Sequence, residues 1–218
     1  MDYPLRRGRC NSCYSRHRNK LIAYKRWQNR TTDASDAYIH ILTLRGWQMS
    51  SMQIARLAGM PPTSLRKAMR AGAEGGVITH KTERRILSVP IPSSHAEVAA
   101  TAEGAERLPV IGTRRRLQAL VAAGWPMITL ADRLGRQRSY LFDLIHVTSY
   151  IHACRHHEVA ALFQELQMQP GPSNAARRYA RERGWALPFQ WDEDQIDDPH
   201  GRPAQKSRRY PNRRKAVA

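Results

Sequence analysis

Apolar side chains recur at helical spacing in two blocks of the chain, 31–92 and 112–169, and little of the sequence alternates as a strand would. In the second block, Leu117, Leu120 and Val121 form the first apolar stripe. The pattern predicts an all-α fold with two small helical domains in tandem. The predicted parts are a basic arm at 1–30, a first domain at 31–92, a linker at 93–111, a second domain at 112–169, a helix and acidic loop at 170–198, and a basic tail at 199–218.

Residues that favour helix starts mark several of these elements. Asp33 or Ser35 suits the cap of a helix over 37–45, and Thr113 suits the first helix of the second block. Ser173 is placed to cap a short helix over 174–183. The segment 93–111 is small in its side chains, weakly patterned and bounded by prolines, and for these reasons we predict a linker there.

The two blocks are related by a shift of 76 residues, which brings Ala55 onto Ala131 and Gly59 onto Gly135. An internal repeat of this size indicates two copies of one folding unit. The other pairs that this shift aligns are Ile54 with Leu130, Ala58 with Leu134, Leu65 with Leu141, and Met69 with Ile145.

The repeated pattern has the steric logic of a helix-turn-helix. Two helices that cross steeply need a small residue where they touch and a backbone that turns sharply between them. Ala55 supplies the small contact, and Gly59 can adopt the positive φ of the turn. Leu65 then points back into the angle from the second helix. We therefore predict helix-turn-helix units centred on 55–69 and 131–145.

Both copies resemble the Cro/C1-type (lambda-repressor-like) helix-turn-helix. The resemblance implies a following helix in each copy, over 77–87 and 147–163. Most of the chain is also similar to small basic tandem helix-turn-helix proteins of actinobacteria and their phages. The similar segments are CNSCYSRHR, GTRRRLQALVAAGW and ERGWALPFQWDEDQIDDP. This wider group implies a DNA-binding regulator, either a phage repressor or a host protein, and nothing more specific.

In this motif the second helix enters the major groove of DNA, and its outward side chains read base edges. Arg pairs with guanine, Gln with adenine, and Asp can accept from cytosine. Because the two copies differ here, they predict a non-palindromic site, unless one copy is only structural. The expected DNA-reading residues are Thr63, Ser64, Arg66, Lys67 and Arg70 in the first copy, and Gln137, Arg138, Ser139, Phe142 and Asp143 in the second.

The formal net charge of +18 favours a polyanionic partner, double-stranded DNA before an anionic membrane. Residues 1–30 carry nine basic and one acidic side chain, and residues 199–218 carry seven basic and none acidic. Two basic arms flanking a nearly neutral middle are typical of extensions that hold phosphates. The expected phosphate-contacting residues are Arg16, Arg18, Lys20, Arg114, Arg115, Arg136, Arg208 and Arg209.

Cys10, Cys13 and His17 are the candidate metal ligands, in the spacing of half a zinc site. A structural zinc needs four protein ligands, and the sequence has no second cysteine pair. The alternative is a basic helix over 12–27 that packs Leu21, Ile22 and Tyr24. We therefore expect no cofactor, with structural zinc as the open alternative.

No spacing of nucleophile and base or glycine-rich phosphate loop indicates an enzyme, and no small-molecule substrate is expected. The acidic run 192–198 favours a solvated loop, or an internal decoy that holds a basic arm away from wrong partners, over a nuclease site. With no apolar run of about 20 residues and no secretion signal, we expect a cytoplasmic, nucleoid-associated transcriptional regulator. The alternatives are an architectural or recombination accessory protein, which would bend DNA, and an RNA-binding protein, which lacks the expected aromatic-bearing sheet. The oligomeric state is left open.

Overall fold

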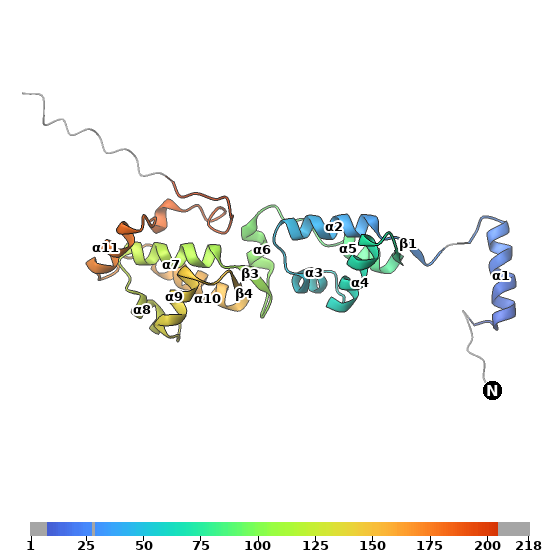
Figure 1. Cartoon of the computed structure of the whole chain (residues 1–218), viewed down its shortest axis with the longest axis horizontal. Helices are drawn as coiled ribbons and strands as arrows, with labels where there is room; N and C mark the ends of the chain where they lie inside the picture. Colours follow the sequence, from blue (N-terminus) through green and yellow to red (C-terminus); the bar gives the residue numbers. More distant parts are fainter. Residues whose placement is uncertain (1–7, 28, 205–218) are drawn as a thin grey trace, which may run out of the picture.

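The computed structural model describes residues 8–27 and 29–204 and is mostly helical, with two two-stranded antiparallel sheets (Figure 1). The all-α class is therefore right in outline, but three-residue strands accompany the helices. Among the described residues, no helix combines the length and apolar character needed to span a bilayer.

The first unit contains two strands and four helices around one core. In chain order these are β1 Thr31–Asp33, α2 Ser35–Gly46, α3 Ser51–Leu57, α4 Pro62–Ala73, β2 Val77–Thr79 and α5 His80–Leu87. Ser50 and Thr79 cap α3 and α5 by accepting hydrogen bonds from the backbone N–H groups of Gln53 and Thr82. The large side chains buried in this core are Ile41, Leu44, Ile54, Leu65 and Ile86.

The second unit repeats this order. Its elements are β3 Arg107–Pro109, α7 Ile111–Ala123, α8 Met127–Arg133, α9 Arg138–His146, β4 Tyr150–His152 and α10 Ala153–Leu166. Its core contains Leu117, Leu120, Leu130, Leu141 and Leu166, all fully buried.

The two sheets pair in the same way, which shows that the repeat extends beyond the helices. Strand β1 pairs with β2, with Thr32 opposite Ile78, and β3 pairs with β4, with Leu108 opposite Ile151. In the first unit, β2 follows α4 and pairs with β1, which precedes α2. In the second unit, β4 follows α9 and pairs with β3, which precedes α7. The predicted following helices consequently begin at His80 and Ala153, because residues 77–79 and 150–152 form strands.

The segment predicted as a linker contains regular secondary structure. Residues 93–111 contain the helix α6 His95–Thr101 as well as β3, which belongs to the second unit. Ser94 caps α6, and the carboxylate of Glu97 accepts a hydrogen bond from the backbone N–H of Ser93. Val98 and Ala99 are buried. The small side chains of this segment resemble a flexible linker in the sequence. In the structure they allow α6 to pack between the two units.

Helix α6 and the turn after it connect the two units through polar contacts from α3. The side-chain amide of Gln53, fully buried, donates to the carbonyl oxygen of Val98 and to the hydroxyl of Thr101. The guanidinium of Arg56 donates to both carboxylate oxygens of Glu106, at 2.8 and 3.2 Å. We call this set of contacts the joint. It holds the first unit against α6 and the start of the second unit.

Two predicted helix caps also differ from the structure. Helix α7 begins at Ile111, and Thr113 lies buried inside it, where its hydroxyl contacts the His156 ring. Helix α2 begins at Ser35, with the Asp33 carboxylate accepting a hydrogen bond from the Ser35 N–H. The prediction for Ser173 is confirmed, because its hydroxyl accepts from the backbone N–H of Ala176 at the start of α11 Asn174–Glu182.

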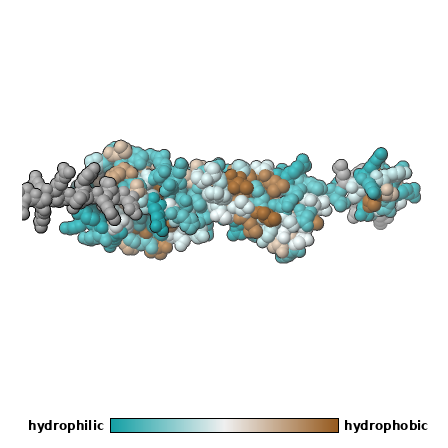
Figure 2. Space-filling model, turned by 90° about the horizontal axis from the view of Figure 1, so that it is seen from above, coloured by the Kyte–Doolittle hydropathy of each residue, from teal (hydrophilic) through white to brown (hydrophobic). Residues whose placement is uncertain are grey.

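Helix α1 Asn11–Ala23 stands apart from the rest of the molecule in both Figure 1 and Figure 2. The predicted packing of this helix is wrong, because none of its residues is buried, and Ile22 and the adjoining Tyr24 are 45% and 65% exposed. A helix of 13 residues without a packed face is marginal in water. It therefore gains less stability from packing than the helices of the two units, each of which has buried residues.

The segment after α11, which includes the short 3-10 helix η1 Pro188–Gln190, folds back onto α7. The Arg115 guanidinium donates to the carbonyl oxygens of Ile196 and Gly201, and it lies 4.7 Å from the ring centre of Trp191. Arg116 holds the Asp197 carboxylate at 2.7 and 2.8 Å. The acidic run is thus not simply solvated, because Asp197 is buried in an ion pair with α7.

A buried polar cluster under this segment contains Thr113, His156, Asp197 and Arg116. The Thr113 hydroxyl lies 2.9 Å from Nδ1 of His156, and Nε2 of His156 lies 3.7 Å from Asp197. Burial lowers the pKa of His156 from 6.5 to about 4; the charges of Arg116 and His157 act in the same direction, and Asp197 opposes them. The folded protein therefore keeps this imidazole neutral at pH values where the unfolded chain protonates it.

We expect the free energy of unfolding to fall as the pH drops from 6.5 to about 4, because only the unfolded state takes up this proton in that window. His156→Gln, which keeps a neutral hydrogen-bonding group, should lose less stability between pH 7 and 4.5 in urea unfolding. His152→Gln, at an exposed position, is the control and should follow the wild type. Equal pH dependence in wild type and His156→Gln would contradict this assignment.

Candidate nucleic-acid interface

The turns between α3 and α4 and between α8 and α9 have the same backbone geometry. Gly59 and Gly135 both have φ of +60°, a conformation that favours glycine. The N–H of Met60 donates to the carbonyl of Ala55, and the N–H of Arg136 donates to the carbonyl of Ala131, each at 2.9 Å. This six-residue hydrogen bond ends a helix in a Schellman motif and sends the chain sharply into the next helix.

Small buried residues let the two helices of each pair approach. Ala55 and Ala131 are fully buried, as are Leu65 and Leu141, which come from the second helix of each pair. The residues that the sequence pattern places between the two helices are therefore buried in both units.

Arg136 occupies the position that buried Met60 holds in the first unit. The turn is not loosened by this exchange, since its hydrogen bonds are the same. Instead, the Arg136 guanidinium lies 3.6 Å from the Glu158 carboxylate of α10, and the side chain is half-buried. Its predicted contact with phosphate stays a prediction, and in this structure the side chain makes an ion pair within the unit.

The second helix of the first pair, α4, presents a cationic surface. Thr63, Arg66 and Lys67 are exposed, and Ser64 is half-buried at the start of the helix. Arg70 is also exposed but pairs with Glu74 one helical turn later, at 3.4 Å. All five predicted residues therefore lie on one short helix, and Arg66 and Lys67 have no ion-pair or hydrogen-bond partner in the described chain.

The corresponding helix α9 presents a mixed surface. Arg138, Ser139 and Asp143 are exposed, and Gln137 is exposed at the residue before the helix. Phe142 is 47% exposed, and its ring lies 4.5 Å from the ring of His146 on the same helix. Helix α9 thus offers amide, guanidinium, carboxylate and aromatic groups together.

Two arginines predicted to contact phosphate are instead bound to the protein backbone. Arg114 donates to the carbonyl oxygens of Leu144 and Thr148, at 3.2 and 2.6 Å, and so holds the C-terminal end of α9 against α7. Arg115 fixes the C-terminal segment. The sequence shows the charge of Arg114 and Arg115 but not the carbonyl groups that bind their guanidinium groups in this structure, and their contact with phosphate stays a prediction.

The remaining predicted residues lie at the two ends of the chain. Arg16, Arg18 and Lys20 are exposed on α1, where the Arg18 guanidinium lies 5.6 Å from the Trp27 ring centre. Arg208 and Arg209 lie outside the described residues.

Cys10 and Cys13 are exposed at the start of α1, and the sulfur of Cys10 accepts a hydrogen bond from the Cys13 N–H at 3.4 Å. This bond lowers the pKa of Cys10, while the adjacent Cys10 raises the pKa of Cys13. His17 does not join them, because the described chain has no group of three histidine, cysteine or acidic side chains placed to hold a metal ion. The four ligands of a structural zinc are thus not assembled within this part of the chain.

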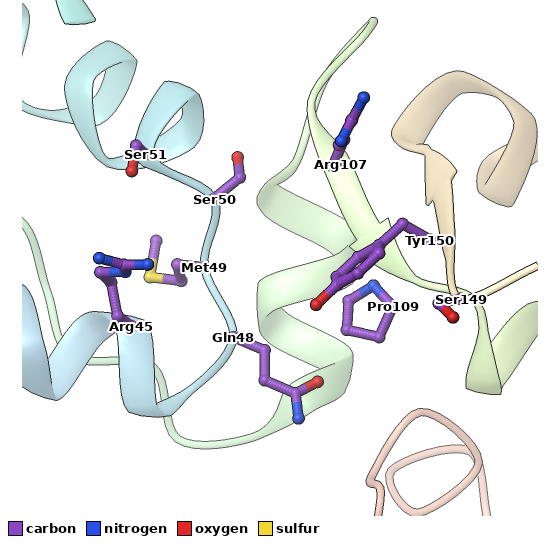
Figure 3. Close-up of a pocket in the computed structure, with 9 residues that line it drawn as sticks. All are labelled: Arg45, Gln48, Met49, Ser50, Ser51, Arg107, Pro109, Ser149 and Tyr150. Atoms are coloured by element: carbon purple, nitrogen blue, oxygen red, sulfur yellow. The ribbon is translucent and has the colours of Figure 1, made fainter.

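Sequence reasoning missed a cleft of about 420 Å³ between the two units (Figure 3). One side comes from the end of α2 and the start of α3, and the other comes from β3, Ser149 and β4. Arg45 and Arg107 bring positive charge to opposite sides. No motif in the sequence indicates this cleft, because its two sides come from different units and meet only where the joint holds these units together.

Comparison with known proteins finds no matching family, no matching curated protein and no matching solved structure.

Replacing Gly59 by alanine should lower the free energy of unfolding by about 1–2 kcal/mol, because a side chain strains the left-handed backbone. The space around Gly59 is open, so backbone strain is the whole cost. Gly46→Ala is the matched control, since its site is also open and its φ is not positive. Urea unfolding should show a loss for Gly59→Ala alone; equal stability of the two variants would contradict the turn geometry.

Proposed function

We propose that this chain is a sequence-specific double-stranded DNA-binding protein in which two unlike helix-turn-helix units read one non-palindromic site. The observation that carries the proposal is the repeated turn at Gly59 and Gly135, each followed by a helix with an exposed polar face. A sharp turn that leads into such a helix is the arrangement with which helix-turn-helix proteins enter the major groove.

The two exposed helices suit different base pairs. On α4, Arg66 and Lys67 favour guanine, whose O6 and N7 accept hydrogen bonds in the major groove. In the second unit, Gln137 just before α9 suits adenine. On α9 itself, Arg138 suits guanine, and Asp143 can accept from the amino group of cytosine. One chain therefore presents two different readers, and a symmetric operator is not expected from a monomer.

Affinity would come mainly from cations outside the readers. Residues 1–30 carry nine basic and one acidic side chain, and residues 199–218 carry seven basic and none acidic, so most of the net charge of +18 lies in these two segments. The exposed cations of α1 and the basic residues of the tail then dominate the attraction to phosphate. Phosphate contacts position a protein on DNA without selecting a sequence. The arms would therefore supply affinity, and the readers would select the bases.

Among regulatory outcomes, repression places the fewest requirements on the protein itself. Occluding a promoter requires tight binding at the right place and no catalytic group. We therefore propose a repressor-like transcriptional regulator that acts at the nucleoid in the cytoplasm.

A second candidate, an architectural DNA-bending protein, is favoured by one observation. Helix α1 carries Arg16, Arg18 and Lys20 on a helix with no buried residue, separated from the body in Figures 1 and 2. An arm of this kind can follow the backbone around a bend. Gel shifts with circularly permuted DNA distinguish the candidates, because a bend makes mobility depend on the position of the site.

Replacing Gln137 and Arg138 together by alanine should change base preference in one half of the selected site and leave the other half unchanged. The expected loss of discrimination is about 1–3 kcal/mol for each bidentate pairing that is removed. In-vitro selection of bound DNA measures this directly, with Arg178→Ala on α11 as an exposed control. Unchanged preference in both halves would contradict the two-reader proposal and leave α4 as the reader.

Removing residues 205–218 should weaken binding to all DNA sequences by a similar factor and flatten the dependence of affinity on salt. This segment carries six basic residues, whereas residues 199–204 pack against Arg115 and Gln190 and are kept. Each phosphate that the shortened protein no longer neutralises should reduce the slope of log K against log salt by about 0.9. A changed sequence preference would count against the division between arms and readers.

A further inference from the structure

The cleft between the two units is open and is lined mainly by polar side chains (Figure 3). Arg45, Gln48 and Met49 line it from the first unit, and Arg107 and Tyr150 line it from the second. Its volume is about 420 Å³. Because both units contribute, the cleft has this shape only while the joint holds them together.

The cleft carries positive charge that no described residue neutralises. The side chains of Arg45 and Arg107 are exposed, and neither has an ion-pair or hydrogen-bond partner within residues 8–27 and 29–204. No aspartate or glutamate of the described chain lines the cleft. The acidic residues of the joint, Glu103 and Glu106, are held by Arg56. The described lining of the cleft thus contains two guanidinium groups and no counter-charge.

Neutral donors accompany the two arginines. The hydroxyl groups of Ser51, Ser149 and Tyr150 and the side-chain amide of Gln48 also line the cleft. In Figure 3 the Tyr150 ring and the Gln48 side chain extend toward the space between the units. Guanidinium, hydroxyl and amide groups are the usual partners of phosphate oxygens in protein–DNA contacts.

We propose that this cleft binds the phosphodiester backbone of the DNA segment that lies between the two half-sites. The inference rests on the proposed function, because it needs DNA bound by both units. A backbone clamp at this place would fix the DNA against the joint and set the register of α4 relative to α9. It would read no bases, since phosphate oxygens are the same in every sequence.

The test uses the full-length protein and its selected DNA site, with the double variant Arg45→Gln, Arg107→Gln. Neither guanidinium has a partner in the described chain, so the variant should fold with an unchanged melting temperature. The slope of log K against log salt should become less steep by about 1.8 if each arginine neutralises one phosphate. Base preference should stay the same. Arg181→Gln on α11, also exposed, is the control and should leave the slope unchanged.

Phosphate ethylation interference adds a positional readout. Ethylation between the two half-sites should weaken binding of the wild type and have no further effect on the double variant. Retained binding with an unchanged slope and unchanged interference would overturn the clamp while leaving the proposed function in place. Absence of any DNA binding by the wild type would overturn both.

A further measurement with inorganic phosphate tests whether the cleft binds a small anion instead of DNA. Inorganic phosphate should stabilise the DNA-free wild type and the double variant equally in thermal unfolding. Specific stabilisation of the wild type, together with an unchanged salt slope on DNA, would assign the cleft to a small anion and overturn the backbone clamp.

Discussion

The two hydrogen bonds between Arg56 and Glu106 join the halves of this molecule. Glu106 is 4% exposed, and its carboxylate also accepts a hydrogen bond from the Glu103 N–H at 2.8 Å. Removing the guanidinium would leave this buried carboxylate without its cation, which is costly in a protein interior. Together with the buried amide of Gln53, this contact gives two units with their own cores one fixed relation.

The proposal that both readers bind one site depends on that relation. Each turn at Gly59 or Gly135 needs only its own unit, because its hydrogen bonds are local. The spacing of α4 and α9, and the cleft between Arg45 and Arg107, need the joint. A rigid joint presents both readers at once. Once one reader is bound, binding of the other then costs no further conformational entropy.

The sequence was sufficient for what depends on local periodicity. The helices, the tight turns and the small residues Ala55 and Ala131 follow from hydrophobic spacing and from glycine. The strands were missed because three residues are too few to show alternation. Helix α6 was missed because its small residues look like a linker when the surfaces on either side are unknown. The roles of Arg114 and Arg115 depend on carbonyl groups 30 and more residues away in the chain.

The central claim is that one chain holds two unlike DNA readers at a fixed spacing. The most direct measurement is the affinity of the protein for its selected site after base pairs are inserted between the two halves. An insertion of about 5 base pairs, half a helical turn, places the halves on opposite faces of the DNA. The account predicts that this insertion reduces affinity to that of a single half-site, and that about 10 base pairs, which restore the face but lengthen the span, do not recover it. Affinity that is unchanged by either insertion would contradict the claim.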